Sequence, residues 1–221
     1  HLSEEVVKIE LIFAEFGERA CPVNRKHFQT YFPDAEIVEI SEEGRKYIGD
    51  PTHPRFGWRM NDYHKVCGLV KSAADIAISF DADMRIVSDQ VKSIIDLVST
   101  FGLCLPISPR RLVRVDNTIG QDGQVLMEDA VRFMHAVNCG IIALDKSNER
   151  AMFCAKTFLR IMERTPMRGP VAWAKAFYIT EFSPCLLPAQ WCVCAEDAGC
   201  GNEIVLHAGH QKVREHYANI L

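Results

Sequence analysis

The fold of this chain is decided by the stretch ISFDADMRIVS, residues Ile78–Ser88. An apolar run, which predicts a strand over Asp75–Phe80, leads directly into Asp81 and Asp83, with the small residue Ala82 between them. Ligands of open α/β sheets bind outside the carboxyl ends of the strands. Two carboxylates at that position can converge on one hard cation, Mg²⁺ or Mn²⁺, which also binds phosphate oxygens. The alternative is a solvated Asp-x-Asp turn, because aspartate is common in turns.

Strands and helices alternate on both sides of this stretch. Apolar and β-branched runs predict strands over Val6–Phe13, Glu36–Ile40, Leu103–Ile107, Gly140–Leu144, Cys185–Leu187 and Ile204–His207. Helical spacing and capping residues predict helices over Asn24–Tyr31, Arg59–Ala74, Ser88–Thr100, Glu128–His135, Asn148–Glu163 and Pro170–Tyr178. Loop residues occupy Gly44–Trp58, and Arg110–Asp122 is polar and irregular.

Alternation of this kind is typical of an α/β fold with a doubly wound, mostly parallel sheet and helices on both faces. The chain has no internal repeat and no clean linker, so we predict a single domain over residues 1–221. Residues from about 1 to 108 would form its nucleotide-binding half, and residues from about 109 to 221 its acceptor-side half.

Composition excludes several classes of protein. The chain has 221 residues, 48% hydrophobic and 24% charged, which is ordinary for a folded domain and excludes disorder. Its net charge of −4 argues against nucleic acid and anionic membranes as partners. Its apolar runs are too short for a membrane span. Because the chain begins at His1 rather than Met, we expect a processed or excised part of a longer protein.

The nine cysteines are odd in number, and four of them cluster late, at Cys185, Cys192, Cys194 and Cys200. A structural zinc site usually has two closely spaced pairs, a pattern that this cluster lacks. We therefore predict free thiols, with a local disulfide as the next alternative and zinc after it. Free thiols favour a reducing compartment and hence the cytoplasm.

Four blocks in order resemble the GT-A glycosyltransferases, above all the family 8 type. They are Tyr63-His64-Lys65 before the motif strand, SFDADM, the run from Asn138 to Asp145, and Leu187-Pro188 with Trp191 followed by the run from Ile204 to Lys212. In that family these blocks read Tyr-x-Arg, YLDADV, N-S/A-G-h-h-h-h-D and LPxxWN with HxxGxxK. The chain departs from the family where a single residue separates His207 from Gly209, and where Gly169-Pro170-Val171-Ala172 replaces an acid-Gln pair.

The resemblance implies a GT-A fold and transfer of a sugar from a nucleotide-diphosphate donor, preferably a UDP-sugar, to a glycan or other hydroxyl acceptor. It implies Mn²⁺, or Mg²⁺, held by Asp81, Asp83 and His207, with His210 on a more open loop. The small Ala82 would let the sugar or ribose approach closely. The other residues expected at the donor are Glu15 at the ribose, Arg59 and Lys65 at the diphosphate, Asn138 and Gly140 at the sugar, and Lys212 near the β-phosphate.

An inverting enzyme would also need a carboxylate base. The candidates are Glu128, Asp129, Glu196 and Asp197, and we retain Asp197 as the catalytic one. A retaining enzyme needs no such base.

Three alternatives stay open. A haloacid-dehalogenase-type phosphatase uses a strand followed by DxDx(T/V), whereas Met84 and Arg85 follow here. A sugar-phosphate nucleotidyltransferase would need a Gly-rich loop after the first strand, where AEFGERACP has one glycine. The third alternative is a non-catalytic module that binds a nucleotide-sugar.

Overall fold

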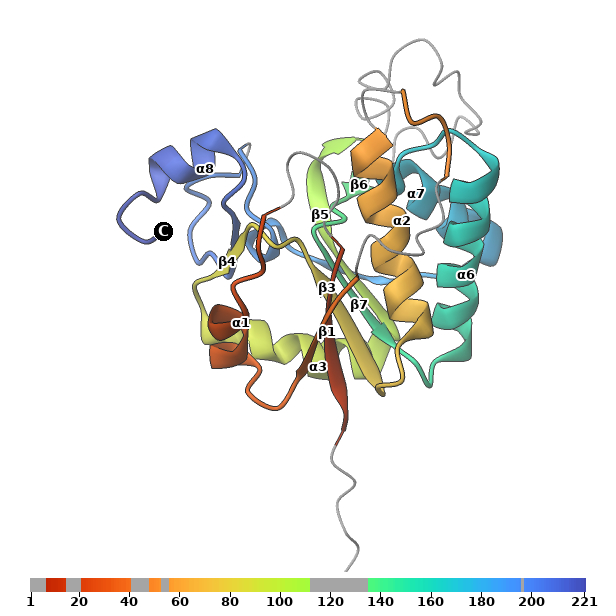
Figure 1. The fold of residues 1–221 in the computed structure, drawn as a ribbon, viewed down its shortest axis with the longest axis horizontal. Coiled ribbons are helices and arrows are strands. Elements are labelled where there is room, and N and C mark those ends of the chain that lie inside the picture. The colour runs from red at the N-terminus through yellow and green to blue at the C-terminus, as the bar shows by residue number, and fades with distance from the viewer. Residues whose placement is uncertain (1–6, 15–20, 41–47, 53–55, 112–134, 196) are drawn as a thin grey trace, which may run out of the picture.

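The computed structural model describes residues 7–14, 21–40, 48–52, 56–111, 135–195 and 197–221 (Figure 1). The first half contains β1 (Ile9–Phe13), α1 (Arg25–Tyr31), β2 (Glu36–Glu39), α2 (Phe56–Lys71), β3 (Ile76–Phe80), β4 (Met84–Ile86), η2 (Asp89–Ser93), α3 (Ile94–Phe101) and β5 (Leu103–Arg111). The second half contains β6 (His135–Val137), β7 (Ile141–Asp145), α6 (Glu149–Arg164), α7 (Gly169–Thr180), β8 (Cys185–Leu187), η4 (Ala189–Trp191), β9 (Val205–His207) and α8 (Gln211–His216).

The main sheet has the strand order β2-β1-β3-β7-β5-β6, with β8 pairing with β5. Five of its strands run in one direction, namely β2, β1, β3, β5 and β8, and β7 and β6 run the other way. The predicted α/β architecture with a mostly parallel sheet in a single domain is therefore confirmed. In β3 all five residues, IAISF, are buried, as expected of a central strand that is covered on both faces.

Helices cover both faces of this sheet, with α2, α6 and α7 grouped on one side and α1 and α3 on the other (Figure 1). Side chains alternate between the two resulting cores. Ile12 and Ala77 pack on the α2 side, and Leu11 and Ile78 pack on the α1 side. The site residues that follow β3 are therefore attached to a strand whose two faces are both packed against helices.

A second, two-stranded sheet pairs β4 with β9 and was not predicted at β4. The register places Met84 opposite His207 and Ile86 opposite Val205. A strand of three residues is too short to show a period in the sequence, and its partner lies more than a hundred residues away. This pairing brings the late histidine to the acidic motif.

Other predicted boundaries shift modestly. The helix α2 begins at Phe56, so the last residues of the predicted Gly44–Trp58 loop are helical. The strand β5 continues to Arg111, through residues predicted as irregular. The predicted helix Glu128–His135 lies outside the described residues except for His135, which begins β6. Ser88 caps the next helical segment as predicted, because its hydroxyl accepts from Gln90 N.

Within the described ranges, no helix combines the length and the apolar character that a bilayer crossing requires.

Candidate functional site

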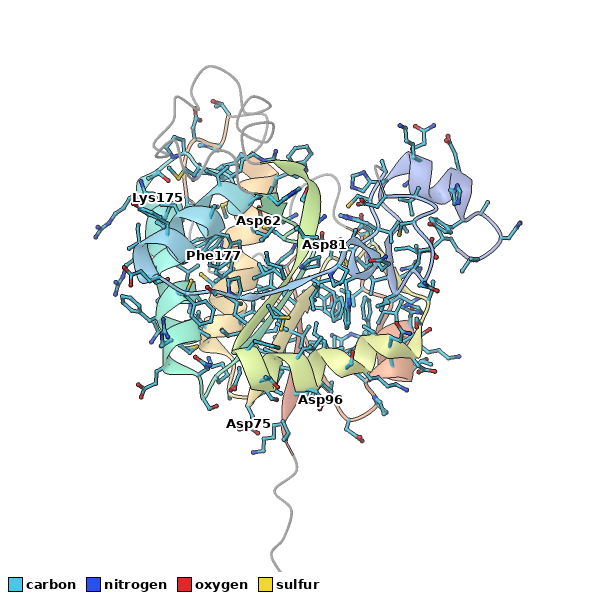
Figure 2. The ribbon with its side chains drawn as sticks, turned by 180° about the vertical axis from the view of Figure 1, so that it is seen from behind. Asp62, Asp75, Asp81, Asp96, Lys175 and Phe177 are labelled. Carbon is cyan, nitrogen blue, oxygen red and sulfur yellow. The ribbon has the colours of Figure 1, made fainter. Side chains whose placement is uncertain are left out.

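The acidic motif forms a tight turn at the carboxyl end of β3. The Asp81 N–H donates to Gly140 O at 2.9 Å, and Met84 N donates back to Asp81 O at 3.1 Å. Figure 2 shows Asp75 and Asp81 at opposite ends of this strand. The turn buries Ala82 almost completely and leaves the two carboxylates partly accessible, with 18% of the Asp81 side chain and 33% of the Asp83 side chain exposed. The close approach of a sugar or ribose that the small Ala82 would allow stays a prediction.

His207 meets both carboxylates through one ring nitrogen. Its Nε2 lies 3.2 Å from Asp83 Oδ1 and 3.6 Å from Asp81 Oδ2. One ligand atom from each of the three residues lies within 4.8 Å of the others, so they can hold one metal ion, as predicted. Ala208 N donates to Asp83 O at 3.1 Å, which fixes the backbone of the two segments together.

Two glycines make room for these carboxylates. A Cβ at Gly209 would collide with Asp83 Oδ2. A Cβ at Gly140 would collide with Met84 and lie 3.1 Å from Asp81 Oδ2. Both glycines were singled out by the sequence, and the structure gives each one a steric reason.

Burial and neighbouring charges shift the pKa values of Asp83 and His207 in opposite directions. Burial by itself raises the pKa of Asp83, but the hydrogen bond and charge of His207 and the charge of Lys65 lower it below its usual value. For His207 the directions are reversed. Burial lowers its pKa, but hydrogen bonds with Asp83 and Cys194 and the charges of both aspartates raise it well above its usual value. Only a deprotonated imidazole nitrogen can bind a cation, so a cation and a proton would compete for His207.

Lys65 is buried, with 2% of its side chain exposed, and forms an ion pair with Asp81 Oδ1. Its Nζ also donates to Cys139 O at 3.2 Å. The lysine predicted to meet a diphosphate therefore holds a site carboxylate in this structure.

Asp62, one turn before Lys65 on α2, is a member of this charge network that sequence analysis missed. Burial raises its pKa to about 6, against the charge of Lys65 and a hydrogen bond from Gly169 N. Figure 2 shows Asp62 and Asp81 in the same part of the molecule. Nothing in the sequence around Asp62 marks it, because its environment is made by α7.

Asn138 connects the acidic cluster to a pair of cysteines. Its Oδ1 accepts from Gly140 N at 2.8 Å, and its Nδ2 donates to Cys194 Sγ at 3.1 Å. Cys194 Sγ also lies 3.7 Å from His207 Nδ1. A hydrogen bond from Cys192 is the main cause that lowers the pKa of Cys194, to about 2, with further donors at His207 and His210.

Cys192 and Cys194 were not predicted as site residues. The C-x-C and H-x-x-H spacings, Cys192 with Cys194 and His207 with His210, were the available signal. All nine cysteines are free, as predicted. His210 lies in the bend directly before α8 and is partly exposed, and its ring lies 4.7 Å from the His207 ring.

The remaining residues predicted at the donor are Arg59, Lys212 and Glu15, and their role stays a prediction. Arg59 donates to Met162 O and Met167 O, each at 3.0 Å, and to Thr165 O, which ties α2 to the end of α6. Lys212 is exposed on α8. Glu15 lies outside the described residues.

The predicted base, Asp197, lies in the turn after Cys194, where its N–H donates to Cys194 O at 3.1 Å. Among the other candidates, Glu128, Asp129 and Glu196 lie outside the described residues. The catalytic role of Asp197 stays a prediction.

No family model and no curated protein sequence matches this chain. Among solved structures, a glycosyltransferase involved in the glycosylation of the major capsid of PBCV-1 aligns with a TM-score of 0.54 and 9% identity, over 95% of this chain and 96% of that one. An active-site mutant of LgtC aligns with a TM-score of 0.50 and 12% identity, over 90% and 86% of the two chains.

A 2-C-methyl-D-erythritol 4-phosphate cytidylyltransferase from Thermus thermophilus aligns less well, with a TM-score of 0.44 and 10% identity over 82% and 89% of the two chains. At these identities the similarity is one of fold, and the better matches agree on which fold it is. The chain therefore has the GT-A fold of nucleotide-sugar glycosyltransferases.

Proposed function

We propose that this chain is a metal-dependent glycosyltransferase that moves a sugar from a nucleotide-diphosphate donor, a UDP-sugar, to a hydroxyl of a glycan or similar acceptor. One observation carries the proposal: Asp81, Asp83 and His207 converge at the carboxyl end of β3 in a GT-A fold. That edge of the sheet is where α/β folds bind their ligands.

The residues present fit a divalent cation. Two carboxylate oxygens and an imidazole nitrogen suit Mn²⁺, and the imidazole is less usual for Mg²⁺. Gly209 leaves room for the Asp83 carboxylate against the backbone, which a side chain at that position would exclude. When bound, the cation would supply positive charge that neutralises the diphosphate of the donor.

The chain's own groups position this centre. Lys65 holds Asp81, and the hydrogen bond from Ala208 N to Asp83 O holds the turn against β9. Glycosyl transfer has an oxocarbenium-like transition state, so its catalysis is mainly electrostatic and positional. An inverting reaction would also need a carboxylate to accept the proton of the acceptor hydroxyl, and we carry Asp197 forward for that role.

The test is calorimetric titration of UDP with and without Mn²⁺. The proposal expects binding that depends on Mn²⁺ and is largely lost in Asp83→Asn. Asp89→Asn is the matched control, because Asp89 is an exposed aspartate on η2 whose side chain is 82% accessible. Equal binding by Asp83→Asn and the wild type would reject the site. Release of inorganic phosphate from a generic aryl phosphate would instead favour the phosphatase alternative.

A further inference from the structure

His207 has a second set of neighbours besides the aspartates. Its Nε2 faces Asp81 and Asp83, whereas its Nδ1 faces Cys194 Sγ at 3.7 Å. Cys192 and Cys194 are both almost fully buried. One ligand atom from each of Cys192, Cys194 and His207 lies within 4.8 Å of the others.

Two polar side chains face the buried sulfur of Cys194. Asn138 Nδ2 donates to its sulfur at 3.1 Å, and His207 Nδ1 lies 3.7 Å from it. A cysteine that only fills a core behaves as a small apolar side chain and needs no such donors. The chain instead directs two polar groups at one buried sulfur.

We propose that Cys192, Cys194 and Nδ1 of His207 form a second metal site, selective for a thiophilic cation such as Zn²⁺, and that its occupation weakens cation binding at Asp81 and Asp83. The distance between the sulfur of Cys194 and Nδ1 of His207 is that expected for two ligands of one zinc ion. Zinc bonds of about 2.3 Å to sulfur and about 2.0–2.1 Å to nitrogen at a tetrahedral angle place the two atoms about 3.6 Å apart. The distance from Cys194 Sγ to His207 Nδ1 is 3.7 Å before any metal is bound.

The fourth ligand of such a site would be a water molecule or His210, whose ring lies 4.7 Å from the His207 ring. The sequence pattern then becomes C-x-C with H-x-x-H, two closely spaced pairs brought together by the turn before β9. The cysteines alone do not show this pattern, because the two histidines supply its second pair.

The competition between the two sites follows from the chemistry of imidazole. A neutral imidazole has one nitrogen lone pair, and its other nitrogen carries a proton. When Zn²⁺ takes Nδ1, the proton resides on Nε2, the atom that faces the two aspartates. Zn²⁺ bound by the thiols would therefore remove one ligand from the Mn²⁺ site. This competition rests on the proposed function, whereas the thiol site itself does not.

The thiol site is tested on reduced wild-type protein loaded with one equivalent of Zn²⁺, by X-ray absorption at the zinc edge. The expected shell contains two sulfurs at about 2.3 Å with nitrogen or oxygen at about 2.0–2.1 Å. A shell of nitrogen and oxygen alone would place zinc at the aspartates and overturn the proposal, without bearing on Mn²⁺ binding.

Cadmium gives a second readout, through its thiolate charge-transfer absorption. We expect one equivalent to produce the band in the wild type and in Cys200→Ser, the control for an exposed cysteine of the same cluster. The band should be lost in Cys192→Ala and Cys194→Ala, with folding checked by near-ultraviolet circular dichroism. If either alanine variant folds and keeps the band, the ligand assignment is wrong.

The competition is measured from free Mn²⁺ by electron paramagnetic resonance. One equivalent of Zn²⁺ should weaken Mn²⁺ binding at least tenfold in the wild type and leave it unchanged in Cys192→Ala. Asp83→Asn should abolish Mn²⁺ binding but keep the cadmium band, so failure of the Mn²⁺ site and failure of the thiol site are distinguishable. Unchanged Mn²⁺ affinity in the zinc-loaded wild type would refute the coupling.

Discussion

Replacing Gly209 by alanine should damage the metal site without unfolding the protein. The added Cβ would collide with Asp83 Oδ2, the tip of a partly exposed side chain. Because a carboxylate can rotate aside, the fold should adjust, and we expect the free energy of unfolding to change by no more than about 1 kcal/mol. For a domain of this size, that corresponds to a shift in Tm of about 2–4 °C.

The effect on the cation should be larger. Disturbing even the hydrogen-bond partners of metal ligands costs about 10–100-fold in affinity, and here a ligand itself is displaced. We therefore expect Mn²⁺ affinity to fall by at least about tenfold, which is about 1.4 kcal/mol. Isothermal titration with Mn²⁺, alone and with UDP, measures this directly.

Gly201→Ala is the matched control for this substitution. A Cβ at Gly201 meets nothing within 4 Å, although its φ of +79° makes any side chain there strained. The control should therefore lose stability and keep its Mn²⁺ affinity. If Gly209→Ala binds Mn²⁺ like the wild type, Asp83 is not a ligand in the geometry described here.

Three further predictions concern the charges around the site. Asp62 should make stability fall as pH rises from about 4 to about 6, because its pKa is raised from 3.8 to about 6 in the folded protein; the stability it adds is complete below 3.8 and lost above 6. Thermal melts of Asp62→Asn should show a flatter pH dependence in that range, and an unchanged slope would contradict the assignment. Lys65→Met should cost about 3–5 kcal/mol, because it leaves Asp81 without its buried partner. Scanning calorimetry should show a Tm about 6–20 °C lower, and a loss within error would mean that the pair contributes nothing. His207→Ala should sharply raise the Mn²⁺ concentration needed for UDP binding, whereas His210→Ala should change it little, and the reverse ranking would exchange their roles.

Much of the fold could be predicted because the decisive segments are long or strongly patterned. The five buried residues of β3 stand out as an apolar run, and Asn148 and Ser88 cap their helices as their types suggest. The strand β4 could not be predicted, because its three residues are held by pairing with β9 rather than by local preference.

In the site too, features that depend on local sequence could be predicted, and features that depend on tertiary packing could not. The convergence of Asp81, Asp83 and His207 could be predicted because the two aspartates lie in one motif, and because His207 matches a known pattern further along the chain. The partners of Arg59 and Lys65 could not be found, because both belong to α2 and the sequence does not say which side chain meets α6 and which meets the sheet edge. The contact of Cys194 with His207 likewise exists only through tertiary packing.

The central claim, that the cluster at Asp81, Asp83 and His207 activates a nucleotide-sugar, is tested most directly by donor hydrolysis without an acceptor. Water can replace the acceptor hydroxyl, so the purified protein should slowly release UDP from its correct UDP-sugar. The release should require Mn²⁺ and be abolished in Asp81→Ala, which removes one of the three proposed ligands. Asp89→Asn should hydrolyse the donor like the wild type. The claim would be contradicted if the folded wild type released no nucleoside diphosphate from any of the common nucleotide-sugars. It would also be contradicted if Asp81→Ala released the nucleoside diphosphate as fast as the wild type.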